Sequence, residues 1–148
     1  MNDTDHKNIN DLIIEQMADA MIYSNSKGII DGWNPAAESL FGYRNDEAIG
    51  ENLNLIIPEH LRDAHWTGFN RAMASGSTKN GGRAAITRSL TKSRGTIYVE
   101  MSFAVVTDQA GKTIGSVAVA RDATQRHRNE QEQRERLKEL QELHQRAG

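Results

Sequence analysis

Short turn-forming stretches divide most of this chain into strand candidates on both sides of a helical middle. A first hairpin is predicted from strands at 20–23 and 29–33, and three further strands are predicted at 84–91, 96–106 and 113–120. Strands joined by such short turns pair antiparallel. The order therefore predicts an α+β fold, a five-stranded antiparallel sheet with helices on one face, flanked by N- and C-terminal helices.

The middle of the chain is predicted to be helical. Asn34-Pro35 is a typical helix start, since asparagine caps a helix and proline fits its first position. This helix is expected to end at Gly42, and a shorter one is predicted at 45–49. The longest helix of the body is expected to begin at 56–58 and to run to about Ala74.

Both ends of the chain differ from this body. Apolar residues at helical spacing predict a short amphipathic helix from Ile9 to Met17. After Thr124 the chain is rich in Gln, Glu and Arg, and its apolar stripe consists mainly of Leu137, Leu140 and Leu143. We expect an N-terminal cap helix in 1–18, a domain in 19–124 and a polar helix in 125–148. That last helix either forms a coiled coil with its copy or stays solvated, and the sequence leaves both open.

The composition argues against several classes of function. A net charge of −2 gives no basic surplus for nucleic acid, and the absence of cysteine excludes disulfides and thiolate nucleophiles. No apolar run reaches the length of about 18 residues that crosses a bilayer, so a cytoplasmic protein is expected. No Gly-rich phosphate loop or nucleophile motif favours an enzyme.

Three motifs resemble the PAS family. The run from Asn34 to Tyr43 resembles the central helix of PAS domains, Ile49-Gly50 precedes the long helix as in the family, and Arg121-Asp122-Ala123-Thr124 resembles the family's exit motif. The resemblance covers about 17–124 and implies a PAS fold. It leaves the ligand open, because PAS domains hold flavin, haem, small acids or nothing.

The segment Ile57-Pro58-Glu59-His60-Leu61-Arg62-Asp63-Ala64-His65 is similar to the haem-binding helix of oxygen-sensing PAS proteins. This resemblance implies haem b as the cofactor, with His65 as the proximal iron ligand. Arg71 matches an arginine that pairs with a haem propionate in the family, and Gly68 would let a flat macrocycle approach the helix. At helical spacing, one face carries Leu61, His65, Gly68, Phe69 and Ala72.

The opposite wall of such a pocket is expected on the later strands. Met101 and Phe103 alternate with Ser102, so they are predicted to face the pocket together. The distal arginine of the oxygen sensors falls on Ala85, and Arg83 lies two residues earlier, where one of them carries a methionine ligand. Ile86 is expected to make the distal wall more apolar. Flavin photochemistry that needs a cysteine is excluded.

Together these features imply a haem-based sensor of O2, CO or NO that signals as a homodimer to a separate partner and is not an enzyme. The alternative is a haem-free PAS dimerisation or scaffold module, or a sensor of a small metabolite. A lone histidine on an apolar helix face is usually a core histidine. Trp33 is predicted in the core and Trp66 on a different helix face from His65. No role is predicted for His6, His60, His127 or His144.

Overall fold

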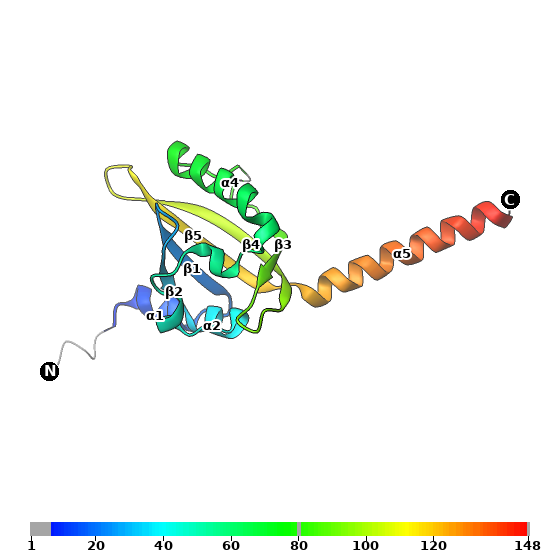
Figure 1. Cartoon of the computed structure of the whole chain (residues 1–148), viewed down its shortest axis with the longest axis horizontal. Coiled ribbons are helices and arrows are strands. Elements are labelled where there is room, and N and C mark those ends of the chain that lie inside the picture. The colour runs from blue at the N-terminus through cyan, green and yellow to red at the C-terminus, as the bar shows by residue number, and fades with distance from the viewer. Residues whose placement is uncertain (1–6, 80, 148) are drawn as a thin grey trace.

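The computed structural model describes residues 7–79 and 81–147, so His6 lies outside the described part of the chain. Five strands form one sheet in the order β2-β1-β5-β4-β3, and all neighbours are antiparallel (Figure 1). This confirms the predicted five-stranded antiparallel sheet. The strands are β1 (Ala20–Asn25), β2 (Ile30–Trp33), β3 (Ala85–Leu90), β4 (Thr96–Thr107) and β5 (Thr113–Asp122).

The register aligns small side chains along the middle of the sheet. Ala118 of β5 lies between Ile22 of β1 and Phe103 of β4, and Ala120 pairs with Met101. Because side chains alternate along a strand, these residues share one face. Alanines on the central strand leave more space above that face than larger residues would.

The helices also follow the predicted order, and those of the middle segment pack over this face of the sheet. The cluster of buried apolar side chains joins the sheet to the middle helices, and Phe41 is its largest fully buried side chain. Trp33 lies in this core as predicted, and its Nε1 donates to the carbonyl oxygen of Tyr43 (2.9 Å). The helical elements are α1 (Ile9–Gln16), α2 (Pro35–Phe41), α3 (Asn45–Ala48), the 3₁₀ turns η2 (Leu53–Ile56) and η3 (Glu59–Leu61), α4 (Arg62–Ser75) and α5 (Thr124–Ala147).

The long helix expected from 56–58 onward is shorter in the structure. The 3₁₀ turn η2 ends at Ile56, η3 occupies Glu59–Leu61, and the α-helix begins only at Arg62. Pro58 explains the break, because proline has no N–H and disfavours helical geometry in the residue before it. Ile57 is extended accordingly, with φ −104° and ψ 118°.

Asn34 joins three elements through its buried side chain. Its Oδ1 accepts hydrogen bonds from the backbone N–H of Met21 (2.8 Å) and Ala37 (3.0 Å), so it caps α2 as predicted. Its amide donates to the carbonyl oxygens of Ile14 (2.9 Å) and Asp19 (3.1 Å). The end of α1, the start of β1 and the start of α2 are thereby held together.

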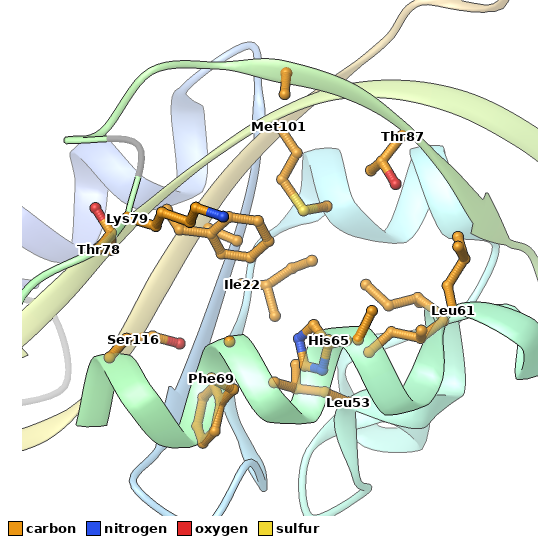
Figure 2. A pocket seen from close by; sticks show the side chains of 18 of the residues that line it. Ile22, Leu53, Leu61, His65, Phe69, Thr78, Lys79, Thr87, Met101 and Ser116 are labelled. Atoms are coloured by element: carbon orange, nitrogen blue, oxygen red, sulfur yellow. The ribbon is translucent and has the colours of Figure 1, made fainter. Parts of the chain in front are cut away.

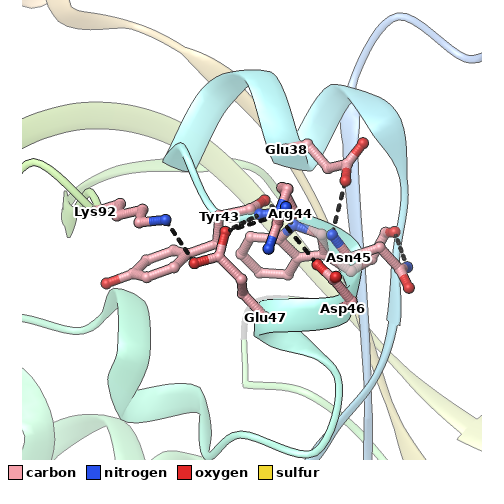
Figure 3. A network of polar contacts seen from close by, with 8 residues as sticks. Glu38, Tyr43, Arg44, Asn45, Asp46, Glu47 and Lys92 are labelled. Carbon is pink, nitrogen blue, oxygen red and sulfur yellow. Dashed lines mark hydrogen bonds and ion pairs between the residues drawn. The ribbon is translucent and has the colours of Figure 1, made fainter.

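A surface network fixes α3 to the β3–β4 turn (Figure 3). Lys92, in that turn, pairs with Glu47 of α3, and its backbone N–H donates to the carbonyl oxygen of Phe41 (2.9 Å). The hydrogen bond from Lys92 lowers the pKa of Glu47. The edge of the sheet that carries β3 is thus tied to the helical layer.

The C-terminal helix α5 projects away from the body (Figure 1). No described residue of α5 is buried, and Leu137, Leu140 and Leu143 are about 60% exposed. Within the part of the chain that the structure describes, none of the helices has the length and apolar character needed to cross a membrane.

Candidate functional site

A cavity of about 430 Å³ lies between α4 and the sheet. Small residues account for it: Ala64, Gly68 and Ala72 line it from the helix, and Ala118 lines it from β5. Much of the remaining wall is apolar, with side chains from β1, η2, η3, α4 and β4, and the segment before β3 and β3 itself complete it. Its size falls within the roughly 300–1,000 Å³ of small-molecule sites, so the fold contains space for a ligand.

His65 points from α4 into this cavity, with Met101 and Thr87 on the strands opposite (Figure 2). Its Nδ1 is buried without a hydrogen-bond partner, the one such side-chain atom among residues 7–79 and 81–147. Burial lowers the pKa of His65, so the imidazole is neutral at pH 7. A neutral imidazole with an unpaired nitrogen can ligate a metal or hydrogen-bond to a ligand.

Most of the predicted site residues meet at this cavity. They come from η3 and α4, from the segment before β3, and from β3 and β4. The eight predicted residues on the wall are Leu61, His65, Gly68, Phe69, Arg83, Ala85, Met101 and Phe103. What each of them does there stays a prediction.

Arg71 is not brought to the cavity. It lies six residues after His65, which places it about 120° around the helix from the imidazole. The structure has it exposed and outside the cavity wall. Arg71 therefore does not line the cavity, and its pairing with a haem propionate stays a prediction.

Ile86 also lies outside the cavity wall. Ala85, Thr87 and Ser89 of β3 line the cavity, so alternation turns Ile86 to the other face of the strand. Ile86 instead lines a second, more open hollow of about 410 Å³ beside α5. Thr87, which the sequence analysis did not single out, takes the place expected of Ile86.

Basic side chains on the cavity wall were only partly predicted. Arg83 was expected there, but Lys79 and Arg88 were not. Among the described residues, no ion pair involves any of these three. Alternation along the strand from Ala85 would have placed Thr87 on the cavity wall. Lys79 lies in a loop, so no periodicity in the sequence indicates that it lines the cavity.

His127 and Trp66 also have contacts that the sequence did not reveal. The His127 ring stacks on Tyr98, with centroids 3.7 Å apart and planes 15° apart, in the second hollow. Trp66 packs edge-on against His65, with centroids 4.7 Å apart, and does not line the cavity. Such contacts join residues far apart in the sequence or depend on rotamers, so spacing alone does not indicate them.

Comparisons with known proteins give short matches to two sensors and a longer one to a kinase. The chain is 45% identical over 53 residues to the sensor protein FixL of Bradyrhizobium diazoefficiens, covering 36% of the chain and 10% of FixL. It is 40% identical over 52 residues to the oxygen sensor protein DosP of Escherichia coli, covering 35% and 6%. The signal transduction histidine-protein kinase AtoS of Escherichia coli is 27% identical over 139 residues, covering 93% and 22%. The chain thus spans less than a quarter of each relative.

Solved structures and a family model extend the likeness to the whole domain. An RNA-binding light-oxygen-voltage receptor superposes with a TM-score of 0.72 at 22% identity, covering 92% of this chain and 38% of the receptor. That identity establishes likeness of fold alone. The family model described as PAS fold matches residues 9–123, most of the chain. The chain therefore belongs to the PAS family.

Proposed function

We propose that this chain is a haem-binding PAS sensor of O2, CO or NO, with His65 as the protein ligand of the haem b iron. The observation that carries the proposal is the buried, unpaired Nδ1 of a neutral imidazole facing an apolar cavity. Because no hydrogen bond from a described residue holds Nδ1, the imidazole is free to coordinate an iron that lies in the cavity through a ring nitrogen. The resemblance of 57–65 to the haem helix of oxygen-sensing PAS proteins, and the match to an oxygen sensor protein, add support.

The other residues of the cavity fit this group. Bound haem would supply an iron centre with a coordination position free for a diatomic gas. The apolar side chains on both walls would contact the macrocycle and exclude water. Lys79 and Arg83 line the wall with no ion pair to a described residue, so they suit the acid groups of haem better than Arg71 does.

Signalling would pass through the sheet into α5. β5 lines the cavity through Ser116 and Ala118, and α5 begins two residues after β5 ends. We infer that the chain acts as a homodimer in the cytoplasm and controls a separate signalling partner, as a sensor and not as an enzyme. The likeness to a histidine kinase over 93% of this chain suggests a kinase as that partner.

The alternative function is a haem-free PAS module that binds a small metabolite. The observation that favours it is the set of basic and hydroxyl side chains on the cavity wall, which would also suit a small carboxylate. Lys79 and Arg83 supply the cations, and Thr87 and Ser116 supply the hydroxyls.

Titration of the purified chain with haemin, followed by absorption, separates the two functions. In the wild type we expect a Soret band that saturates at one haem per chain. In His65→Ala we expect this band to be lost. His60→Ala is the matched control, because His60 is exposed and does not line this cavity. Absence of saturable binding, or an unchanged spectrum in His65→Ala, would contradict the proposal.

A further inference from the structure

Helix α4 has few attachments to the rest of the domain. It forms one wall of the cavity, so much of the face it turns toward the sheet meets empty space. Phe69 is its one buried residue. The position of His65 over the cavity must therefore depend on the contacts that α4 makes elsewhere.

Arg62 makes such contacts at the start of α4, where its Nε donates to the carbonyl oxygen of Ile57 (3.0 Å), and Trp66 makes them one turn further along. Its Nε1 donates a hydrogen bond to Oδ1 of Asn54 in η2 (2.8 Å). Its ring lies on Gly28 in the β1–β2 turn, so closely that a Cβ at Gly28 would lie 2.3 Å from Cη2 of the indole. Gly28 also has φ +80°, which favours glycine. The turn therefore provides a slot that the indole fills.

The same indole contacts the imidazole. The rings of Trp66 and His65 meet edge to face with centroids 4.7 Å apart, and Trp66 meets Phe69 in the same way at 5.2 Å. The His65 and Phe69 rings are stacked, with centroids 6.0 Å apart. Trp66 itself does not line the cavity. It can thus affect the direction of His65 without touching a ligand.

We propose that Trp66 is a positioning residue for His65. Anchored on Gly28 and Asn54, it holds α4 against the β1–β2 turn and η2, so that the imidazole keeps its direction into the cavity as a ligand enters or leaves. The direction of His65 matters only if His65 has its proposed role, so this part of the inference rests on the proposed function. The anchoring of α4 by Trp66 is independent of that function.

The test uses Trp66→Phe and Asn54→Leu, which each remove one partner of the hydrogen bond and keep much of the side-chain volume. Trp33→Phe is the matched control, because it removes an indole hydrogen bond of similar length (2.9 Å) away from α4. Two quantities are measured: the rate of haem transfer from the loaded protein to excess apomyoglobin, and amide hydrogen exchange of α4 in the haem-free protein.

We expect Trp66→Phe and Asn54→Leu to speed haem release and α4 exchange about fivefold to tenfold relative to Trp33→Phe. Release and exchange no faster than in Trp33→Phe would overturn the positioning role. If the wild type takes up no haem, the proposed function fails, and the exchange of α4 still decides whether Trp66 anchors the helix.

Discussion

His65 differs from the other described histidines in its surroundings. His60 and His144 are exposed, and His127 stacks on an aromatic ring, whereas His65 has a buried nitrogen without a partner. Burial favours the neutral imidazole and lowers the pKa of His65. His65 therefore contributes to the dependence of the haem-free domain's stability on pH.

The sign of that link follows from proton binding. The unfolded chain protonates His65 around its ordinary pKa of 6.5, whereas the folded chain does so only at lower pH. Protonation then favours the unfolded state, so the free energy of unfolding falls as the pH drops below about 6.5 and is unaffected by His65 above it. We expect His65→Gln to reduce this loss. Urea unfolding of both haem-free proteins at pH about 7.5 and about 5.5 measures it, and equal losses would show that other groups cause it.

The composition of the wall opposite His65 predicts that CO and NO bind well and that O2 binds less tightly than in sensors with a distal arginine. The side chain of Ala85 has no hydrogen-bond donor. A hydrogen bond from a charged side chain to bound O2 would stabilise the complex by roughly 1.5–3 kcal/mol. We expect Ala85→Arg to raise the affinity for O2 relative to CO by about tenfold to a hundredfold.

Flash photolysis and O2 titration of the haem-loaded proteins would measure these affinities. Arg83→Ala is the informative companion, because Arg83 also lines the cavity. A fall in O2 affinity in Arg83→Ala, with no gain in Ala85→Arg, would show that Arg83 already provides the donor.

At the scale of elements, the contacts that hold α5 to the described part of the body lie near its start. The backbone N–H of Ala123 donates to the carbonyl oxygen of Tyr98 (2.8 Å), and Arg126 pairs with Glu100. The ring of His127 stacks on Tyr98. Residues beyond the second turn are exposed, so in the proposed sensor this short contact would transmit a change in the sheet to the helix.

Removing the stack should loosen that contact. An aromatic pair contributes about 0.5–1.5 kcal/mol beyond area burial, so His127→Ala should raise amide exchange in the first two turns of α5 by about twofold to tenfold. His144→Ala, in the exposed last turn, is the control. Unchanged exchange at the start of α5 would mean that the backbone and ion-pair contacts hold the helix alone.

The sequence predicted the elements better than the contacts between them. Turn signals and alternation gave the five strands, and the Asn34-Pro35 start gave α2 with its cap. The segment before Arg62 has apolar residues at helical spacing, so it was predicted as part of the long helix. In the structure, Pro58 interrupts the helix there. Apolar spacing does not distinguish a 3₁₀ turn from the first turn of an α-helix.

The site was predicted where periodicity decides orientation. The shared face of Leu61, His65 and Gly68, and the alternation of Met101 with Phe103, place these residues on the cavity wall. The same periodicities, applied to Arg71 and Ile86, turn both side chains away from that wall. The cavity position of the loop residue Lys79 and the anchoring of Trp66 depend on how a loop and a turn pack, which no spacing encodes.

At the scale of the whole molecule, the sheet order brings the two ends of the domain together. β1 and β5 are neighbours, and Arg121 pairs with Asp19 (2.8 Å), so the end of α1 and the start of α5 lie in the same region. Both helices have exposed apolar residues, Ile9 and Ile13 in α1 and the three leucines in α5. A parallel dimer would bury both sets at once.

Substitution of Leu137, Leu140 and Leu143 by Gln tests this dimer. Each leucine contributes roughly 1–2 kcal/mol if buried, so the triple variant should sediment as a monomer at concentrations where the wild type is a dimer. Substitution of the exposed Glu135, Glu139 and Glu142 by Gln is the control. A wild type that is itself a monomer, or a triple variant that stays dimeric, would contradict the prediction.

The central claim, that His65 is the ligand of the iron, is tested most directly by returning a free imidazole to a chain that lacks the side chain. In His65→Gly, haemin and imidazole added together should restore the wild-type Soret spectrum, and haemin alone should not. Far-ultraviolet circular dichroism establishes that the variant is folded. A folded variant with the wild-type spectrum before imidazole is added would show that another group binds the iron.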